Sequence, residues 1–415
     1  MAFSNSSTEQ RASPLAGIRV IAVEQAVAAP LCTRHLADLG ADVIKIERPD
    51  GGDFARDYDS VVHGESAYFV WLNRGKRSAV LNLKSLDGRA ALDSLLESAD
   101  VLVSNLGPGA LERLDLGWVG VHARWPRLIC CAITGYGTEG PLRDRKSFDL
   151  LVQGEAALFA VTGTAEQPAK VGLPVADISA GMYALSGVLV ALLQRASTGV
   201  GTRIDIAMLD CLAEWMTPAL YHRAYMGQEP ERTGVRHPTI CPYGPYRVGG
   251  AATVNLAVQN QRQWEAFCVF VLQRPDLIDD DRFRSNEVRV GHRAELDRVI
   301  EDCFASTSLS AVLAALDRAD VPWAEVNDVG ALLEHPQLRA RARWTQVDTP
   351  SGPAPALKSP LQAAGSVESG MAVPALGEHT AEVLAHVGQP DNVAMPPRAA
   401  HAGHAHARFP EHPDD

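Results

Sequence analysis

The chain has 415 residues, which is enough for two domains at the usual size of roughly 100–200 residues each. Hydrophobic residues make up 46% and charged residues 21%, as is typical of a folded protein with a substantial core. The formal net charge of -12 argues against a nucleic-acid-binding protein, because affinity for phosphate backbones comes from clustered Lys and Arg. No cationic segment precedes an apolar stretch at the N-terminus, and the most apolar run, residues 182–193, is shorter than the roughly 20 residues that cross a bilayer. We therefore expect no membrane contact, and the scattered cysteines, most of them in apolar runs, favour a reducing cytoplasm.

The cysteines and the two chain ends suggest no metal site. The seven cysteines are scattered and form no Cys-x-x-Cys pair, so neither a zinc site nor a redox motif is indicated. Residues 1–14 and 389–415 are predicted to be disordered tails. The second tail carries four histidines that could chelate a metal, but a solvated tail is the favoured interpretation: His401, His404, His406 and His412.

Residues 15–209 alternate between apolar runs and helical stretches. We expect strands at residues 18–23, 42–47, 101–104 and 128–133. We expect helices at residues 31–39, ended by Gly40, and at 85–98, capped by Ser85. This alternation predicts an α/β domain with a Rossmann-like parallel sheet, in which ligands bind beyond the carboxyl ends of the strands.

The pattern changes in residues 210–325, which we predict to form a smaller α+β domain. The segment 237–246 is too rich in Pro and Gly for regular structure, whereas 252–258 alternates like a strand. Helices are expected at residues 264–272, 288–304 and 309–319, and strand-like segments resume at 321–326. Residues 326–388 are predicted to return to the large domain.

A single carboxylate, Asp177, follows an extended apolar stretch and stands at the start of a long helix rich in small residues. That placement favours the ionised and accessible state that a nucleophilic carboxylate requires. A structural role is the alternative, because Asp is among the best helix N-cap residues. Both roles stay open from this segment alone.

The first βα turn, residues 24–30, contains no glycine. Glu47 ends the second strand at about the spacing where dinucleotide folds place their ribose-binding acid, but without glycines the backbone cannot approach a pyrophosphate. A nicotinamide enzyme is therefore disfavoured. Arg48, the Lys76-Arg77 pair and Arg113 follow strand ends or edges and could hold the phosphates of a nucleotide-like ligand, unless they are ordinary solvated cations.

Several motifs in order resemble the class III CoA-transferases, which include formyl-CoA transferase and carnitine CoA-transferase-like enzymes. The resemblance runs from Leu15 to Gly388. Its motifs are Leu15-Ala-Gly-Ile-Arg-Val20, Leu39-Gly-Ala-Asp-Val-Ile-Lys-Ile-Glu-Arg48, Asn73-Arg-Gly-Lys-Arg77, Asn105-Leu-Gly-Pro-Gly109, Gly135-Tyr-Gly137, Asp177 and Gly377-Glu-His-Thr380.

The resemblance implies a two-domain protomer, an interlocked homodimer, and a CoA thioester as co-substrate with no permanently bound cofactor. It implies that Asp177 is the nucleophile. It places at the CoA site Val27, Arg48, Asn73, Lys76, Asn105, Leu106, Arg113 and Tyr136, and at the substrate pocket Gly135, Gly137 and Met208. One departure is Val27, because many relatives carry Gln shortly before the first-turn Pro, and Gln25 stands two residues earlier.

In the mechanism that the resemblance implies, Asp177 attacks an acyl-CoA thioester, and backbone N–H groups at Gly135 and Gly137 stabilise the oxyanion. The α-methylacyl-CoA racemases share the scaffold but use a His-Asp pair where this chain has Phe148 and Asp149. Since Phe148 cannot move protons, racemase activity is disfavoured, and a non-catalytic CoA-binding relative is the other alternative.

The acceptor is suggested by the segment 237–246, which stands where formyl-CoA enzymes have a poly-glycine lid. Arg236, His237 and Tyr243 offer donors for a second carboxylate, and the wording is similar to relatives that act on short dicarboxylates. We expect succinyl-CoA as donor and itaconate, mesaconate, citramalate or glutarate as acceptor. A purely structural, Pro-braced turn is the alternative.

Overall fold

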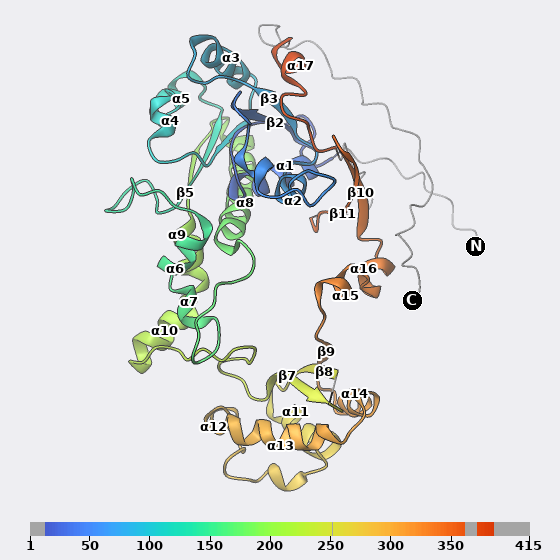
Figure 1. The fold of residues 1–415 in the computed structure, drawn as a ribbon. Coiled ribbons are helices and arrows are strands. Elements are labelled where there is room, and N and C mark those ends of the chain that lie inside the picture. The colour runs from blue at the N-terminus through green and yellow to red at the C-terminus, as the bar shows by residue number, and fades with distance from the viewer. Residues whose placement is uncertain (1–12, 251, 362–371, 386–415) are drawn as a thin grey trace, which may run out of the picture.

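The computed structural model describes residues 13–250, 252–361 and 372–385. The predicted tails lie outside these residues except for Ser13 and Pro14, and so do the four histidines His401, His404, His406 and His412. Figure 1 shows a larger upper lobe and a smaller lower lobe joined by two separate segments of chain. One segment carries α10 (Thr217–Met226), and the other carries α15 (Val329–Leu333) and α16 (Pro336–Ala340).

The larger lobe is built on a six-stranded parallel sheet in the order β3-β2-β1-β4-β5-β6. Its strands are β1 (Arg19–Val23), β2 (Asp42–Glu47), β3 (Arg77–Val80), β4 (Val101–Ser104), β5 (Ile129–Thr134) and β6 (Arg203–Ala207). The four predicted strands are confirmed to within one residue at each end. The two edge strands β3 and β6 were not predicted, because each begins with Arg and neither contains a continuous apolar run of more than two residues.

Helices cover both faces of this sheet, as the alternation predicts. The helices of the larger lobe are α1 (Ala28–Asp38), α2 (Ala67–Asn73), α3 (Leu86–Glu97), α4 (Ala110–Arg113), α5 (Trp118–Arg124), α6 (Asp149–Glu155), α7 (Leu158–Val161), α8 (Val175–Thr198) and α9 (Met208–Trp215). Ser85 caps α3 as predicted, since its hydroxyl accepts from the backbone N–H of Gly88 at 3.1 Å. The first helix begins at Ala28, three residues earlier than predicted.

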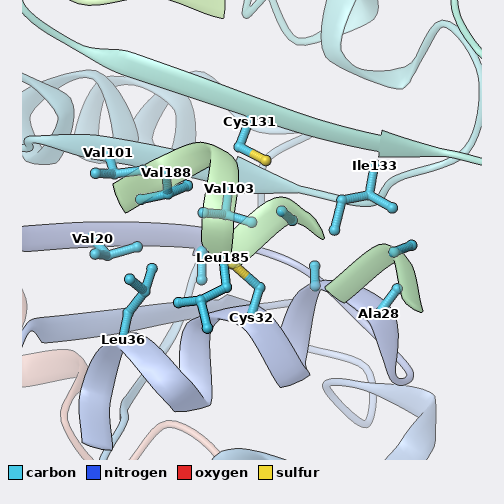
Figure 2. Packing of buried hydrophobic residues seen from close by; sticks show 14 of the residues in the cluster. Val20, Ala28, Cys32, Leu36, Val101, Val103, Cys131, Ile133, Leu185 and Val188 are labelled. Carbon is cyan, nitrogen blue, oxygen red and sulfur yellow. The ribbon is translucent and has the colours of Figure 1, made fainter. Parts of the chain in front are cut away.

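Alternate residues of the central strands enter two separate cores. Val20 of β1 and Val103 of β4 pack under α1 and α8, while Ile21 and Leu102 face α3 and α5. Figure 2 shows the first core, in which side chains of α1, α8 and the strands point toward one another. The two helices approach closely because position 181 is glycine, where a Cβ would stand 2.6 Å from the carbonyl oxygen of Ala28.

The long helix α8 passes a length and composition test for a membrane-spanning helix, with a mean hydropathy of 1.7 over its most apolar 18 residues. In the described residues it is the one helix that does so. Its inner face, which includes Ala180, Ala184, Leu185 and Val188, is buried in the core against α1 and the sheet. This packing accounts for the apolar composition.

The smaller lobe packs helices against a three-stranded antiparallel sheet in the order β7-β8-β9. Its elements are β7 (Tyr243–Val248), β8 (Ala252–Ala257), α11 (Gln261–Ala266), a π-helical turn at Phe267–Val271, a 3-10 turn at Pro275–Leu277, α12 (Asn286–Gly291), α13 (Arg293–Ala305), α14 (Leu309–Arg318) and β9 (Trp323–Glu325). The expectation of no regular structure at 237–246 is wrong for β7. The expected helix 288–304 is two helices that meet at His292.

The core of the smaller lobe spans Cys241 to Val321, whereas Cys211 and Leu212 of α9 are buried in the core of the larger lobe. Residues 210–216 therefore pack with the larger lobe, although the sequence places the boundary at 210. Beyond the smaller lobe, the hairpin β10 (Trp344–Thr349) and β11 (Gly352–Leu357) packs against α2, and α17 (Thr380–Ala385) packs beside β3.

Candidate functional site

A cavity of about 640 Å³, called the main cavity below, lies at the carboxyl edge of the sheet. Its walls come from the first βα turn, the segment after β4, the segment 143–150 and the start of α8. Asp177 lies in it, beside the rings of Phe54, Tyr58, Tyr68 and Phe148. These rings contact one another in three tilted or edge-to-face pairs, which are Phe54–Tyr58, Phe54–Phe148 and Tyr58–Tyr68. The aromatic side of the cavity is therefore a packed wall.

Beneath the first turn lies a group of buried charges, the first-turn charge cluster (Glu24, Lys45, Asp53 and Lys76). The Lys45 ammonium donates to Asp53 at 2.8 Å and to Glu24 at 3.4 Å, and the Lys76 ammonium donates to Glu24 at 2.7 Å. All four side chains are at most 4% exposed. Each charge therefore has an opposite partner, which is the condition for keeping it in the interior.

This cluster fixes the shape of the glycine-free turn. Ala26 adopts a φ of 62°, a left-handed conformation that is unusual for a residue with a side chain. Its N–H donates to Asp53 Oδ1 at 3.0 Å. Asn105 holds the neighbouring residue, because its Oδ1 accepts from the N–H of Gln25 at 2.9 Å and its Nδ2 donates to the Gln25 carbonyl at 2.7 Å. The turn is thus held against the main cavity from two sides.

Asp177 is the third residue of α8, one turn before the close contact of this helix with α1. The N-cap residue is Pro174, and Asp177 makes no capping bond, so the structural alternative for this residue is wrong. The capping acceptor comes from Asp149 on α6, whose Oδ1 accepts from the N–H groups of Ala176 at 2.8 Å and Asp177 at 3.3 Å.

The carboxyl of Asp177 is reachable from the cavity but has protein on most sides. Burial, and next the negative charge of Asp149, raise the pKa of Asp177 to about 7. We expected the helix N-terminus to keep this acid ionised, and that expectation is wrong, because desolvation outweighs the helix end. Around neutral pH the carboxyl is divided between its two protonation states.

The main cavity brings together several residues that the sequence indicates. Val27, Asn105, Leu106, Gly135 and Met208 all line it with Asp177. Gln25, which stands two residues before the position of the missing glutamine, also lines this cavity. The cations Arg143, Arg145 and Lys146 line it too and were missed, since nothing in the sequence shows that the loop returns over β5.

Two predicted CoA contacts are placed elsewhere. Lys76 is 3% exposed and its ammonium is bonded to Glu24, Asn73 and the Pro30 carbonyl. Asn73 is fully buried. Neither side chain is open to a ligand, so these two predictions are wrong.

A second cavity of about 310 Å³, called the outer cavity, lies beyond the ends of β1, β2 and β3. Arg48 lines it as predicted, and its guanidinium has an exposed partner in Asp50 at 3.8 Å. Lys84 lines it as well and was missed, because β3 was not predicted and the position after a strand end went unseen. Gln25 and Leu106 line both cavities, so the two form one groove.

The remaining predicted residues of this lobe, which are Gly137, Tyr136 and Arg113, line neither the main nor the outer cavity. The Gly137 N–H donates to the Thr134 hydroxyl at 3.0 Å, so the predicted oxyanion role is wrong for this N–H group. Tyr136 lies under the guanidinium of Arg145 at 5.6 Å. Arg113 is exposed and donates to the Pro108 carbonyl.

The three predicted acceptor residues belong to the smaller lobe and do not line either cavity. Arg236 lies 3.5 Å from both Asp297 and Glu301 and stacks on Tyr246 at 4.0 Å. His237 stacks on Tyr243 with the rings nearly parallel and 4.9 Å apart. Burial and the nearby Arg293 lower the pKa of His237, so its ring is neutral at pH 7.

Within the described residues, no group of three or more His, Cys, Asp or Glu side chains could hold a metal ion. All seven cysteines are free, and burial raises the pKa of Cys32, Cys131 and Cys241 among them, so these thiols are poor nucleophiles. None of these three thiols lines the main cavity, whose acidic side chains are Asp149 and Asp177.

The sequence matches CoA-transferase family III over residues 15–380. It is 33% identical over 396 residues to the succinate–glutarate CoA-transferase of Agrobacterium fabrum, covering 93% of this chain and 98% of that protein. It is 34% identical over 386 residues to the succinyl-CoA:mesaconate CoA-transferase of Haloarcula hispanica, covering 89% and 96%. A CAIB/BAIF family protein from Brucella suis has a similar structure, with a TM-score of 0.78 at 32% identity and coverage of 91% and 100%. The chain belongs to CoA-transferase family III and is an enzyme that uses a CoA thioester as co-substrate.

Proposed function

We propose that this enzyme transfers CoA from succinyl-CoA to a short dicarboxylic acid such as glutarate or mesaconate, and that Asp177 carries the intermediate. The observation that supports this most is the groove, in which the Asp177 carboxyl and the cations Arg48 and Lys84 occupy opposite ends. The two relatives above are named for these acids. Itaconate and citramalate have the same two carboxylates and remain candidate acceptors.

In the proposed binding mode, Arg48 and Lys84 hold the phosphates of CoA. The pantetheine arm then runs past Leu106, and the thioester reaches Asp177. Asn105 acts by clamping Gln25, and the Gln25 side chain faces the acyl group from the wall of the main cavity.

The proposed reaction balances without a net proton. An oxygen of ionised Asp177 attacks the thioester carbonyl, the C–S bond breaks, and a mixed anhydride and CoA thiolate form. The thiolate attacks the Asp177 carbonyl and releases succinate, leaving an aspartyl-CoA thioester. The acceptor carboxylate then displaces the thiolate, which returns to the acceptor carbonyl and frees Asp177. Positioning supplies much of the rate, since a carboxylate is a weak nucleophile.

For the second carboxylate of the acceptor we propose Arg143, Arg145 and Lys146. All three line the main cavity, and Asp144 and Glu155, the acidic partners of the two arginines, are exposed. Arg236 does not fit the role of binding the acceptor carboxylate, because its guanidinium is paired with Asp297 and Glu301 of its own lobe.

We also propose that the chain forms the homodimer that the family resemblance implies. Exposed apolar side chains on α8 and α10 support an interface, among them Leu193, Tyr225 and Met226. Light scattering should give twice the chain mass. A monomer at working concentration would contradict the dimer and leave the chemistry at Asp177 untouched.

An exchange assay tests the function. Purified enzyme is incubated with succinyl-CoA and a panel of mono- and dicarboxylic acids, and new acyl-CoA species are detected by mass spectrometry. We expect transfer to C4–C6 dicarboxylates, and a loss of about 10⁴-fold or more in Asp177→Asn. Asp210→Asn, an exposed acid in the first turn of α9, is the matched control. Retained turnover in Asp177→Asn contradicts the assignment, and solvent deuterium at the α-carbon of a 2-methylacyl-CoA would favour a racemase.

A further inference from the structure

Asp149 begins α6, but its side chain reaches the start of a different helix. Its Oδ1 accepts from the backbone N–H groups of Ala176 and Asp177, at 2.8 and 3.3 Å. The first turn of α8 receives no side-chain capping bond from its own N-cap residue, Pro174. Asp149 therefore supplies from α6 the acceptor that the first N–H groups of α8 need.

Asp149 is itself held in place by Gln153, one turn further along α6. The Gln153 amide nitrogen donates to Asp149 Oδ2 at 2.6 Å, and its oxygen accepts from the Val171 N–H at 3.1 Å. Gln153 is 1% exposed. It thus connects Asp149 to the segment that leads into α8, and the position of Asp177 depends on this connected set.

We propose that Asp149 is a positioning residue for the nucleophile, which it fixes through the backbone of α8 while its negative charge faces the Asp177 carboxyl. The inference rests on the proposed function, because it assigns Asp149 a part in the step that Asp177 carries. It also assigns a role to Asp149, which with Phe148 occupies the position of the His-Asp pair of the racemases. Here the acid is occupied by backbone donors instead of a proton-transfer partner.

The chemical consequence concerns basicity. A carboxylate with a raised pKa is a stronger nucleophile once it is ionised. The other titratable or charged side chains that line the cavity around Asp177 are Tyr58, Tyr68, Arg143, Arg145 and Lys146. Burial raises the pKa of Tyr58 to about 12, so that phenol is neutral. The first turn and the start of α1 contribute only neutral residues to this cavity, namely Gln25, Ala26, Val27 and Ala28.

Two substitutions separate the charge of Asp149 from its hydrogen bonds. Asp149→Asn keeps an amide oxygen for the Ala176 N–H and removes the charge, and it replaces the oxygen that accepts from the Gln153 amide nitrogen with a second donor. We expect the acid limb of its kcat/KM profile to move to lower pH by about 0.5–1 unit, with kcat at pH 8 within about tenfold of wild type. Asp149→Ala removes both, and the misplaced nucleophile should lower kcat by about 10²-fold as well. Asp210→Asn should change neither quantity.

A readout that does not need turnover is the ¹³C NMR titration of labelled aspartate carboxyls. One resonance should titrate near pH 7, disappear in Asp177→Asn and move to lower pH in Asp149→Asn. An unmoved titration in Asp149→Asn overturns the inference even if transfer is intact. Conversely, a wild-type enzyme that transfers CoA to no acid overturns the proposed function, while the shifted resonance still supports the coupling of the two acids. An Asp149→Ala enzyme with wild-type kcat overturns the positioning role.

Discussion

Two groups of charged side chains in the larger lobe are built in opposite ways. In the first-turn charge cluster, both lysines are bonded to acids at 2.7–3.4 Å, and every carboxylate has a cation. At the start of α8, the acid pair (Asp149 and Asp177) has no cation between its members, and the pKa of Asp177 rises to about 7. The balanced cluster supports the backbone, whereas the unbalanced pair lies where a ligand can reach it.

The larger lobe thus keeps the charges that hold its backbone apart from the acid pair that faces the main cavity. The balanced cluster holds Ala26 in its left-handed conformation through Asp53 and so shapes one wall of the main cavity. That wall and α8 meet at the Ala28–Gly181 contact, one turn beyond Asp177. A perturbed carboxyl in a cavity indicates function, whereas buried charges with full sets of partners indicate architecture.

The largest expected effect comes from unbalancing the first cluster. Lys45→Met leaves Asp53 and Glu24 buried without their shared cation, and we expect a loss of about 3–5 kcal/mol in the free energy of unfolding. Urea unfolding followed by circular dichroism measures it. Arg262→Ala is the control, because the pair of Arg262 with Asp320 is 79% and 81% exposed, and should change stability by less than about 1 kcal/mol. Equal losses in the two variants would contradict the distinction.

Removing the charge of Asp177 should increase the free energy of unfolding, in contrast to the loss expected for Lys45→Met. Because the pKa of folded Asp177 is raised from 3.8 to about 7, the folded state binds more protons than the unfolded state between these values. The stability of the wild type therefore falls as pH rises through this window. Asp177→Asn should be more stable than wild type at pH 8, and the difference should vanish near pH 4. Urea midpoints at pH 8, 6 and 4.5 measure it, and an Asn variant less stable at pH 8 would refute the raised pKa.

The cations of the main cavity should act on the binding of the acceptor. Replacing Arg143 and Arg145 together by Ala should raise the KM for a dicarboxylate acceptor about 10–100-fold, the usual cost of a lost charge-assisted contact. The KM for succinyl-CoA should change less, and so should the rate with a monocarboxylate. Steady-state kinetics with paired acceptors measures this. Equal effects on both acceptors would point to a general electrostatic role.

The smallest expected loss of stability is at the uncharged helix cap Ser85. Ser85→Ala removes the cap of α3, where the hydroxyl accepts from Gly88, and should cost about 1 kcal/mol. Ser85→Asn keeps a capping oxygen and should be close to wild type. Urea unfolding of both measures it, and a larger loss than in Lys45→Met would reverse the expected order.

Sequence reasoning recovered the sheet where apolar runs are long and missed it at the edges. The strands at 42–47 and 101–104 match because their buried residues form continuous runs. The strands at 77–80 and 203–207 begin with Arg and were not recognised. Because β3 was not predicted, Lys84 was not recognised as a cation that follows the end of a strand.

At the site, the sequence indicated Asp177, Val27, Asn105 and Leu106, all of which meet in one cavity. It gave the wrong environment for two charges. Lys76 was expected to be open to CoA and is buried, and Asp177 was expected to be stably ionised and is perturbed. Burial and neighbouring charges depend on contacts across the chain, such as Asp149 with Asp177, and a local pattern does not contain them.

In the proposed mechanism, the Asp177 carboxyl exchanges oxygen with its substrates. In the proposed sequence an acceptor oxygen remains on Asp177 after each turnover. The measurement uses an ¹⁸O-labelled dicarboxylate acceptor with succinyl-CoA, followed by digestion and mass spectrometry of the peptide that contains Asp177. The account predicts ¹⁸O in the Asp177 side chain after the first turnover and in released succinate from the second turnover onward. Product acyl-CoA formed while Asp177 stays unlabelled would contradict it.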